Sequence, residues 1–248
     1  MAASRSFEGK AVAVTGTQGG IAATIAERFL AAGARVAIGT ADDRAAVPLE
    51  APQLKGAVTL PLDPRDPASI KTFYDRCESA LGGLDIVVVP GKSVSTAPVL
   101  EIPAETLKSV VEEELIGAAL LMQEAARRMA PRRFGRIVTL VSMSGKTGVH
   151  RGVAPFAAAK GGLIAFARVL AAELASSGVT VNTIATSLFE PQVAHLSEAR
   201  RREQAAGIPV GRFGRPDEAA EAVLFLASDA GGFVTGETLN MSGGRFMD

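Results

Sequence analysis

The sequence predicts an α/β fold, a single doubly wound domain in which a seven-stranded parallel sheet carries helices on both faces. Short β-branched runs alternate with longer segments of helical periodicity, which is the pattern of parallel strands joined by crossover helices. Hydrophobic residues make up 48% of the 248 residues, enough for a core on both faces of such a sheet. No internal repeat or long Pro/Gly/Ser linker divides the chain. We therefore expect one domain over residues 1–248.

Seven short apolar runs are the predicted strands. They lie at residues 11–16, 35–40, 58–63, 84–89, 136–142, 180–185 and 237–242. Helical periodicity marks the segments between them, at residues 21–33, 66–81, 104–130, 156–177 and 216–228. Residues 187–210 interrupt this alternation with an irregular polar segment. In a doubly wound sheet that position overhangs the ligand crevice, so we expect a substrate-loop insertion there.

The charge and cysteine content argue against several classes of protein. The 26 basic and 26 acidic residues balance, so no net field attracts nucleic acid or an anionic membrane. Cys77 is the single cysteine and cannot form an internal disulfide, and the first ten residues lack the apolar run of a secretory signal. The apolar stretches are shorter than the about twenty residues that a membrane span needs. We expect a cytoplasmic protein with no metal site that binds neither nucleic acid nor membrane.

A glycine-rich turn, TGTQGGIA at residues 15–22, joins the first predicted strand to the first predicted helix. Gly16 permits a sharp turn, and Gly20 lets the backbone approach a pyrophosphate at the helix N-terminus, which offers free N–H groups and a positive dipole end. We expect Gln18 and Ile21 to complete the loop. The position of this turn predicts a Rossmann-type dinucleotide site, whereas a role in chain geometry alone is the alternative.

Two further stretches resemble those of classical short-chain dehydrogenases/reductases. They are GRIVTLVSMSG followed by PFAAAKGGLIAFARVLAAELASSGVTVN, and the C-terminal IPVGRFGRPDEAAEAVLFLASDAGGFVTGETLNMSGG. The resemblance covers essentially the whole chain. It implies a ketoreductase-like protein that uses NAD(P). It also implies association into dimers or tetramers through the long helices after the fourth and fifth strands and through the last helix and strand.

The resemblance also implies where the catalytic residues lie. In this family a Ser positions the carbonyl, a Tyr transfers a proton, a Lys lowers the Tyr pKa and binds the cofactor ribose, and an Asn completes a proton relay. The Ser position is Ser142 and the Lys position is Lys160, so both are retained. The Tyr position is Phe156 and the Asn position is Glu114, so both are replaced. A phenyl ring has no exchangeable proton, and a positioned proton donor contributes about 10²- to 10⁴-fold in rate.

The replaced positions leave two interpretations open. Glu114 either forms a structural ion pair with Lys160, or joins Ser142 and His150 in a substitute acid/base set for an isomerisation, dehydration or cyclisation. Likewise, Ser142 and Lys160 are either catalytic or retained because they cap the backbone and pair with Glu114. The single tyrosine, Tyr74, is expected on the helix before the fourth strand, away from the site.

The cofactor contacts that the resemblance implies are altered as well. The family's Asn-Asn-Ala-Gly after the fourth strand is Val-Pro-Gly-Lys at residues 89–92, and Pro90 lacks a backbone donor. The Pro-Gly that follows the sixth strand and faces the nicotinamide is Thr186-Ser187 here. Pro191 replaces the threonine that contacts phosphate. We therefore expect dinucleotide binding to be weak or absent.

Coenzyme preference depends on the end of the second predicted strand, where an acidic residue favours NAD. Thr40 stands at that position, Asp42 and Asp43 follow slightly late, and Gly19 replaces the basic residue that recognises a 2′-phosphate. The GTAD sequence resembles NADPH-using acyl-carrier-protein ketoreductases, which favours NADP slightly. Asp63 matches the acidic residue that contacts adenine, and its alternative role is a turn residue that caps the next helix.

Three functions are compatible with this sequence. The leading hypothesis is a non-catalytic or structural subunit that pairs with an active paralogue in a mixed tetramer, because both sites are altered while the interface segments keep the family pattern. The second is an NAD(P)-dependent oxidoreductase of a hydroxyl or ketone, acyl thioesters included, with water held by Ser142 and Lys160 as proton donor. The third is a redox-neutral lyase, cyclase or isomerase that uses Glu114, Ser142 and His150.

Overall fold

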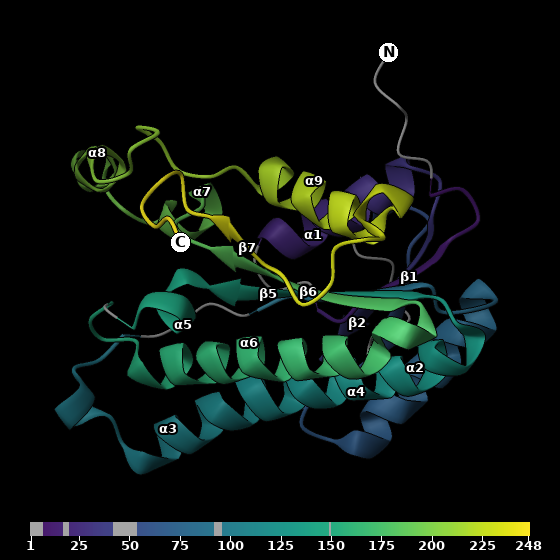
Figure 1. The fold of residues 1–248 in the computed structure, drawn as a ribbon. Helices are drawn as coiled ribbons and strands as arrows, with labels where there is room; N and C mark the ends of the chain where they lie inside the picture. The colour runs from purple at the N-terminus through teal and green to yellow at the C-terminus, as the bar shows by residue number, and fades with distance from the viewer. Residues whose placement is uncertain (1–6, 17–19, 42–53, 92–95, 149) are drawn as a thin grey trace.

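The computed structural model describes residues 7–16, 20–41, 54–91, 96–148 and 150–248. Their strands form one parallel sheet in the order β3-β2-β1-β4-β5-β6-β7, which confirms the predicted α/β class (Figure 1). The strands are β1 (Ala11–Val14), β2 (Arg35–Thr40), β3 (Val58–Pro61), β4 (Ile86–Val89), β5 (Gly135–Ser142), β6 (Val179–Thr186) and β7 (Thr238–Met241). The order reverses between β1 and β4, the place where such sheets form a ligand crevice.

The central strands are buried on both faces, as their continuous apolar sequences require. Every residue of β1, β4 and β6 is buried. Polar side chains within β6 form hydrogen bonds at this depth: Asn182 Nδ2 donates to the Val234 carbonyl at 2.8 Å, and Thr186 Oγ1 donates to the Val141 carbonyl at 3.2 Å. These bonds offset the cost of burying polar groups.

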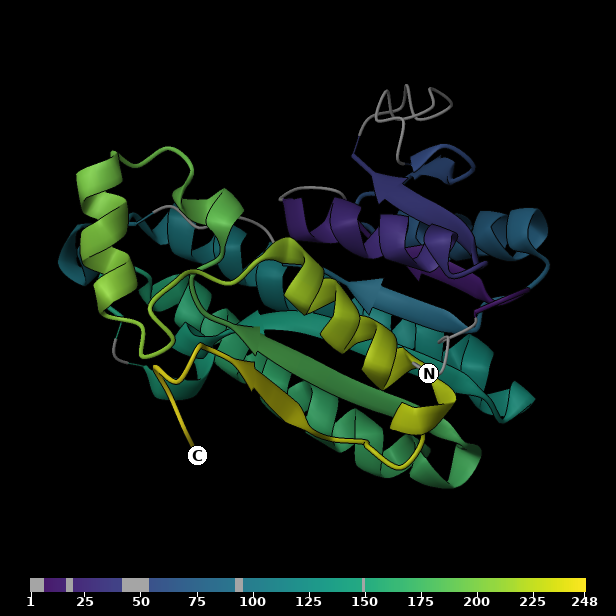
Figure 2. The same ribbon diagram turned by 90° about the horizontal axis from the view of Figure 1, so that it is seen from above.

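Helices cover both faces of the sheet and form two separate hydrophobic clusters. One face carries α2 (Pro67–Leu81), α4 (Ala118–Met129) and α6 (Ala154–Leu174). The other carries α1 (Gly20–Ala31) and α9 (Pro216–Ala227), which lie side by side in Figures 1 and 2. Tyr74 lies on α2, where its buried hydroxyl donates to the Leu121 carbonyl at 3.1 Å. Its predicted place before the fourth strand is confirmed.

The predicted helix over residues 104–130 is divided. It comprises α3 (Ala104–Val111), a π-helical segment (Glu112–Gly117) and α4. This segment packs closely against the residues before α2. A Cβ atom on Gly117 would lie 2.7 Å from the Pro64 carbonyl oxygen. A π-helical segment differs from an α-helix in its i→i+5 hydrogen bonds, and six residues are too few for periodicity to distinguish the two.

Helix α6 is long and apolar, and one of its faces packs in the hydrophobic core. The segment Ala154–Ser177 is the one helix among the described ranges that is long and apolar enough to cross a membrane. Its residues Leu163, Ile164 and Ala167 are buried in the same cluster as β5 and β6 side chains. It is therefore a core helix of the doubly wound fold.

Short helices gather beyond the carboxyl ends of β5 and β6 (Figures 1 and 2). They are α5 (Met143–Thr147), α7 (Glu190–Val193) and α8 (Glu198–Ala206). The last two belong to the irregular segment 187–210. The packing of this segment is separate from the main core, because Val193, Ile208 and Phe213 form a cluster of their own.

Candidate functional site

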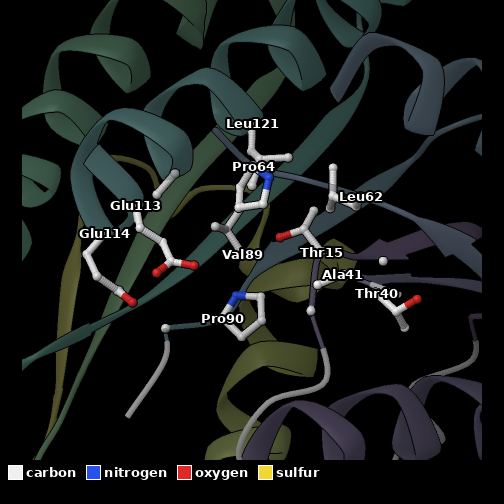
Figure 3. A pocket seen from close by; sticks show the side chains of 14 residues that line it. Thr15, Thr40, Ala41, Leu62, Pro64, Val89, Pro90, Glu113, Glu114 and Leu121 are labelled. Carbon is white, nitrogen blue, oxygen red and sulfur yellow. The ribbon is translucent and has the colours of Figure 1, made fainter. Parts of the chain in front are cut away.

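Three cavities meet at the carboxyl edge of the central strands. The Thr40 cavity is lined by the ends of β1, β2 and β4 together with Glu113 and Glu114 (Figure 3). The Lys160 cavity is lined by the start of α1, by Pro90 and by residues of α6 and β6. The His150 cavity lies among α5, β6, α7 and α8. The described residues of the predicted site are thus divided between neighbouring spaces along one crevice.

The Thr40 cavity contains the predicted residues Gly16 and Thr40. Its volume is about 100 Å³. Figure 3 shows the Thr40 side chain on one side of this space and the two carboxylates of Glu113 and Glu114 on the other. The Thr40 hydroxyl oxygen is buried and has no hydrogen-bond partner among the residues that the structure describes. A buried hydroxyl of this kind fits a polar ligand such as a ribose.

The Lys160 cavity brings together most of the predicted catalytic positions. Ser142, Phe156 and Lys160 all line it, and the first residues of α1, Gly20 and Ile21, line it as well. Phe156 and Lys160 lie one turn apart on α6, and the Lys160 ammonium is 5.5 Å from the centre of the Phe156 ring. The Tyr position therefore faces the site and presents a phenyl ring there.

The Lys160 ammonium is held by a carboxylate. Its Nζ lies 2.7 Å from Glu114 Oε2, and the two side chains are only 2% and 9% exposed. Glu114 reaches this position from the π-helical segment. An ion pair this deeply buried is stable only while both partners are present. Of the two interpretations of Glu114, the ion pair is the contact that the structure contains.

The other members of the alternative acid/base set lie elsewhere. Ser142 lines both the Lys160 cavity and the His150 cavity, His150 lines only the latter of these two, and Glu114 lines the Thr40 cavity. The Ser142 hydroxyl caps α5 by accepting from the Ser144 backbone N–H at 3.1 Å. His150 Nδ1 is 3.1 Å from Ser144 Oγ, so the histidine interacts with a different serine.

Proline side chains lie close to two glycines of the first turn, Gly16 and Gly20. Pro191 Cγ lies 3.0 Å from the position that a Cβ atom on Gly20 would occupy, so its ring packs on the first residue of α1. Pro90 Cγ lies 3.6 Å from the corresponding position on Gly16. A pyrophosphate would approach the same helix N-terminus. The residues present therefore fit the adenosine side of a dinucleotide better than its nicotinamide side.

The remaining predicted cofactor residues have local partners or lie outside the described part of the chain. Asp63 accepts from the Arg65 backbone N–H at 3.0 Å and pairs with the Arg65 guanidinium at 3.1 Å. The cap of α2 is Asp66, whose carboxylate accepts from two backbone N–H groups. Asp63 thus lies in the turn before that cap. Gln18, Gly19, Asp42, Asp43 and Lys92 lie outside the described residues.

Sequence reasoning missed the composition of the His150 cavity. This cavity has a volume of about 650 Å³, and its lining includes His195 and Arg245 besides His150. Burial lowers the pKa of His150, and the positive charge of Arg245 lowers it further. The chain has only two histidines, and one of them lies in the segment 187–210. The presence of one of two histidines in the expected substrate loop was the one signal in the sequence for this cavity. No local motif connects His150, His195 and Arg245.

Comparisons with known proteins agree with this architecture. A family model described as enoyl-(acyl carrier protein) reductase matches residues 16–245. The chain is 38% identical over 243 residues to the 3-oxoacyl-[acyl-carrier-protein] reductase FabG of Escherichia coli (strain K12), covering 97% of this chain and 99% of that protein. It is 34% identical over 245 residues to FabG of Aquifex aeolicus (strain VF5), covering 97% and 98%.

A solved structure gives the same result. A short-chain type dehydrogenase/reductase from Mycobacterium marinum matches with a TM-score of 0.88 and 28% identity, covering 98% of each chain. The site and fold thus define an α/β protein of the dinucleotide-binding type. The chain belongs to the short-chain dehydrogenase/reductase family and is related to 3-oxoacyl-[acyl-carrier-protein] reductases.

Proposed function

We propose that this chain is a non-catalytic subunit that associates with an active member of the same family. The observation that carries the proposal is the phenyl ring of Phe156 beside a lysine that is paired with Glu114. Reduction of a ketone needs a proton at the carbonyl oxygen as well as a hydride at carbon. The Tyr position has no proton to give, and the Lys160 ammonium is already bound to a carboxylate.

Weak or absent dinucleotide binding is part of this proposal. When bound, NAD(P) supplies the hydride in this family. The Pro191 ring lies close to Gly20 and narrows the cavity at the α1 N-terminus, and Pro90 has no N–H to donate. The Thr40 cavity keeps room and a partnerless hydroxyl on the adenosine side. We expect residual affinity from that side, with NADP slightly favoured over NAD.

Association with another subunit is supported by apolar side chains on the helices. Leu107 of α3, Ile116 of the π-helical segment and Val169 of α6 are each at least half exposed. Apolar residues exposed together on neighbouring helices are typical of interaction surfaces. The partner in this proposal is an active paralogue, and segment 187–210 is a substrate loop over the crevice.

The test is purification of the full chain alone and together with an active paralogue from the same cell. We expect no reduction of a 3-oxoacyl thioester by the chain alone and a mixed tetramer whose activity depends on the paralogue's tyrosine. The matched control replaces that tyrosine by Phe in the paralogue, which leaves the complex intact and inactive. A homotetramer of this chain that turns over substrate unaided contradicts the proposal.

A second candidate is an NAD(P)-dependent oxidoreductase of an acyl thioester with water as proton donor. It is favoured by the match over 97% of the chain to a protein named as a 3-oxoacyl-[acyl-carrier-protein] reductase. Ser142 and Lys160 line one cavity, where they could hold such a water. Titration of NADPH and NADH with detection of nicotinamide fluorescence separates the candidates, because this one requires saturable binding and NADPH consumption by the chain alone.

A further inference from the structure

The His150 cavity has a one-sided charge. Its lining carries one guanidinium, from Arg245, and the imidazoles of His150 and His195. No Asp or Glu is among the described residues that line it. The Thr40 cavity differs, because two carboxylates line it. A guanidinium that faces no carboxylate among the described lining residues favours an anionic ligand.

Arg245 differs from the arginines that have structural roles. Arg128 contacts three carboxylates, and Arg212 is held by Glu218 at 2.6 Å. Within the part of the chain that the structure describes, Arg245 has no carboxylate within ion-pair distance. It follows β7 directly and lines the cavity while remaining exposed. Its guanidinium is therefore available to a ligand.

The charge of Arg245 acts on the space beside His150. It disfavours a second positive charge on that imidazole and thereby lowers the pKa of His150. His150 is also in contact with Ser144 Oγ at 3.1 Å, which fixes the ring at the edge of the cavity. Arg245 and His150 thus line the same cavity, Arg245 from the C-terminal segment and His150 from the residues after α5.

About half of the remaining lining residues are apolar, and the other half are uncharged polar residues. The apolar ones include Met143, Val153, Phe156, Leu188, Val193 and Leu196. With a volume of about 650 Å³, the cavity has room for a ligand with several carbon atoms. The lining therefore combines an apolar surface with a cationic group, which suits an amphipathic anion.

We propose that the His150 cavity binds a carboxylate with a hydrocarbon chain, and that Arg245 is the residue that recognises the carboxylate. The planar guanidinium donates two parallel N–H bonds to a carboxylate, a geometry that gives both affinity and orientation. The apolar lining holds the hydrocarbon chain. This inference goes beyond the proposed function, because such binding requires neither hydride transfer nor a partner subunit.

The experiment compares two probes that differ only in charge, hexanoate and hexanamide, by calorimetric titration of the full chain. We expect hexanoate to bind more tightly than hexanamide. Arg245→Met should weaken hexanoate binding about tenfold or more, the loss expected for a charge-assisted hydrogen bond. Hexanamide binding should be unchanged, and Arg245→Lys should give an intermediate affinity for hexanoate. Arg127→Met, which removes an exposed arginine of α4, is the matched control and should have no effect.

The position of the probe is read from the imidazoles. Because the chain has two histidines, a long-range ¹H–¹⁵N spectrum contains two imidazole systems, and His195→Gln assigns them. Hexanoate should shift the His150 signals in the unaltered chain and in Arg127→Met. Equal affinity for the two probes, no detectable binding of either, or unchanged hexanoate affinity in a folded Arg245→Met chain overturns the proposal. None of these outcomes depends on whether the chain reduces a ketone.

Discussion

The two sides of the crevice differ in the contacts that their side chains already make. On the side of the Thr40 cavity, small residues such as Gly16, Gly39 and Ala41 line the space, and the buried Thr40 hydroxyl has no hydrogen-bond partner among the described residues. On the side of the Lys160 cavity, a proline ring packs on Gly20 and the lysine is bound to Glu114. The sheet and helices that carry both sides are the same. The difference teaches that one frame holds an open cavity on one side and a buried ion pair on the other.

On the side of the Lys160 cavity, the charges of the buried residues compensate each other. A carboxylate at the Glu114 position would be costly to bury alone, and so would the Lys160 ammonium. Together they neutralise each other at 2.7 Å. The aromatic ring of Phe156 beside the ammonium adds a favourable cation–π contact. These three residues form a stable polar core that requires no ligand.

The largest expected effect comes from breaking this ion pair. Glu114→Ala leaves the Lys160 ammonium buried without its carboxylate, and we expect the free energy of unfolding to fall by about 3–5 kcal/mol. Urea denaturation measures it. Glu105→Ala is the control, since Glu105 pairs with Lys108 in solvent, and its cost should stay below about 1 kcal/mol. The double variant Glu114→Leu/Lys160→Met should recover most of the loss. Equal costs for Glu114→Ala and Glu105→Ala would contradict a structural role for the pair.

The next effect tests whether the proton donor and the pair act together. Phe156→Tyr alone restores a hydroxyl but leaves Lys160 bound to Glu114. We therefore expect Phe156→Tyr/Glu114→Asn to reduce a 3-oxoacyl thioester with NADPH about 10²-fold faster than Phe156→Tyr, the lower end of the contribution of a positioned proton donor. Phe166→Tyr/Glu114→Asn, with the hydroxyl elsewhere on α6, is the matched control and should stay inactive. If Phe156→Tyr alone is as active as the double variant, the ion pair does not silence the site.

A smaller effect concerns the glycine turn. Pro191→Thr removes the ring that packs on Gly20 and adds a hydroxyl that can donate to phosphate. We expect the Kd for NADPH to fall about tenfold, as one hydrogen bond to a charged group provides. Nicotinamide fluorescence measures it, with NADH titrated in parallel. Pro209→Thr, at a proline that packs on Gly244 instead, should leave the Kd unchanged. An unchanged Kd in Pro191→Thr would show that the ring does not hinder binding.

The fold was predictable because its signals are local. Apolar runs, helical periodicity and the turn at Gly16 each identify an element from a few neighbouring residues. The positions of Phe156 and Lys160 were predictable for the same reason, since they lie one turn apart on a single helix. The Glu114–Lys160 contact was one of two interpretations, because opposite charges brought near each other in a core must pair.

Other features of the site depend on contacts between distant segments. Pro191 reaches Gly20 across the crevice, and Arg245 meets His150 from the C-terminal segment. No periodicity or motif encodes such contacts. The π-helical segment was not predicted for another reason. Six residues are too few for apolar periodicity to distinguish a π-helix from an α-helix.

The smallest expected effect concerns the electrostatics of the His150 cavity. Burial and the charge of Arg245 both lower the pKa of His150 from its ordinary value of 6.5. Arg245→Met removes one cause and leaves the other, so the pKa of His150 should rise while remaining below 6.5. A ¹H–¹⁵N titration measures it, and Arg212→Met, at an arginine held by Glu218, should leave it unchanged.

The same change has a consequence for stability. A histidine whose folded pKa is lowered takes up protons more readily in the unfolded state, so its contribution is fully present above pH 6.5 and is lost as the pH falls through the folded pKa. With a pKa closer to 6.5, Arg245→Met should lose less stability between neutral and mildly acidic pH than the unaltered chain. Denaturation at a series of pH values tests this difference. If the pH dependence of both chains is the same, Arg245 does not act on His150, and the cationic side of the cavity is weaker than the geometry indicates.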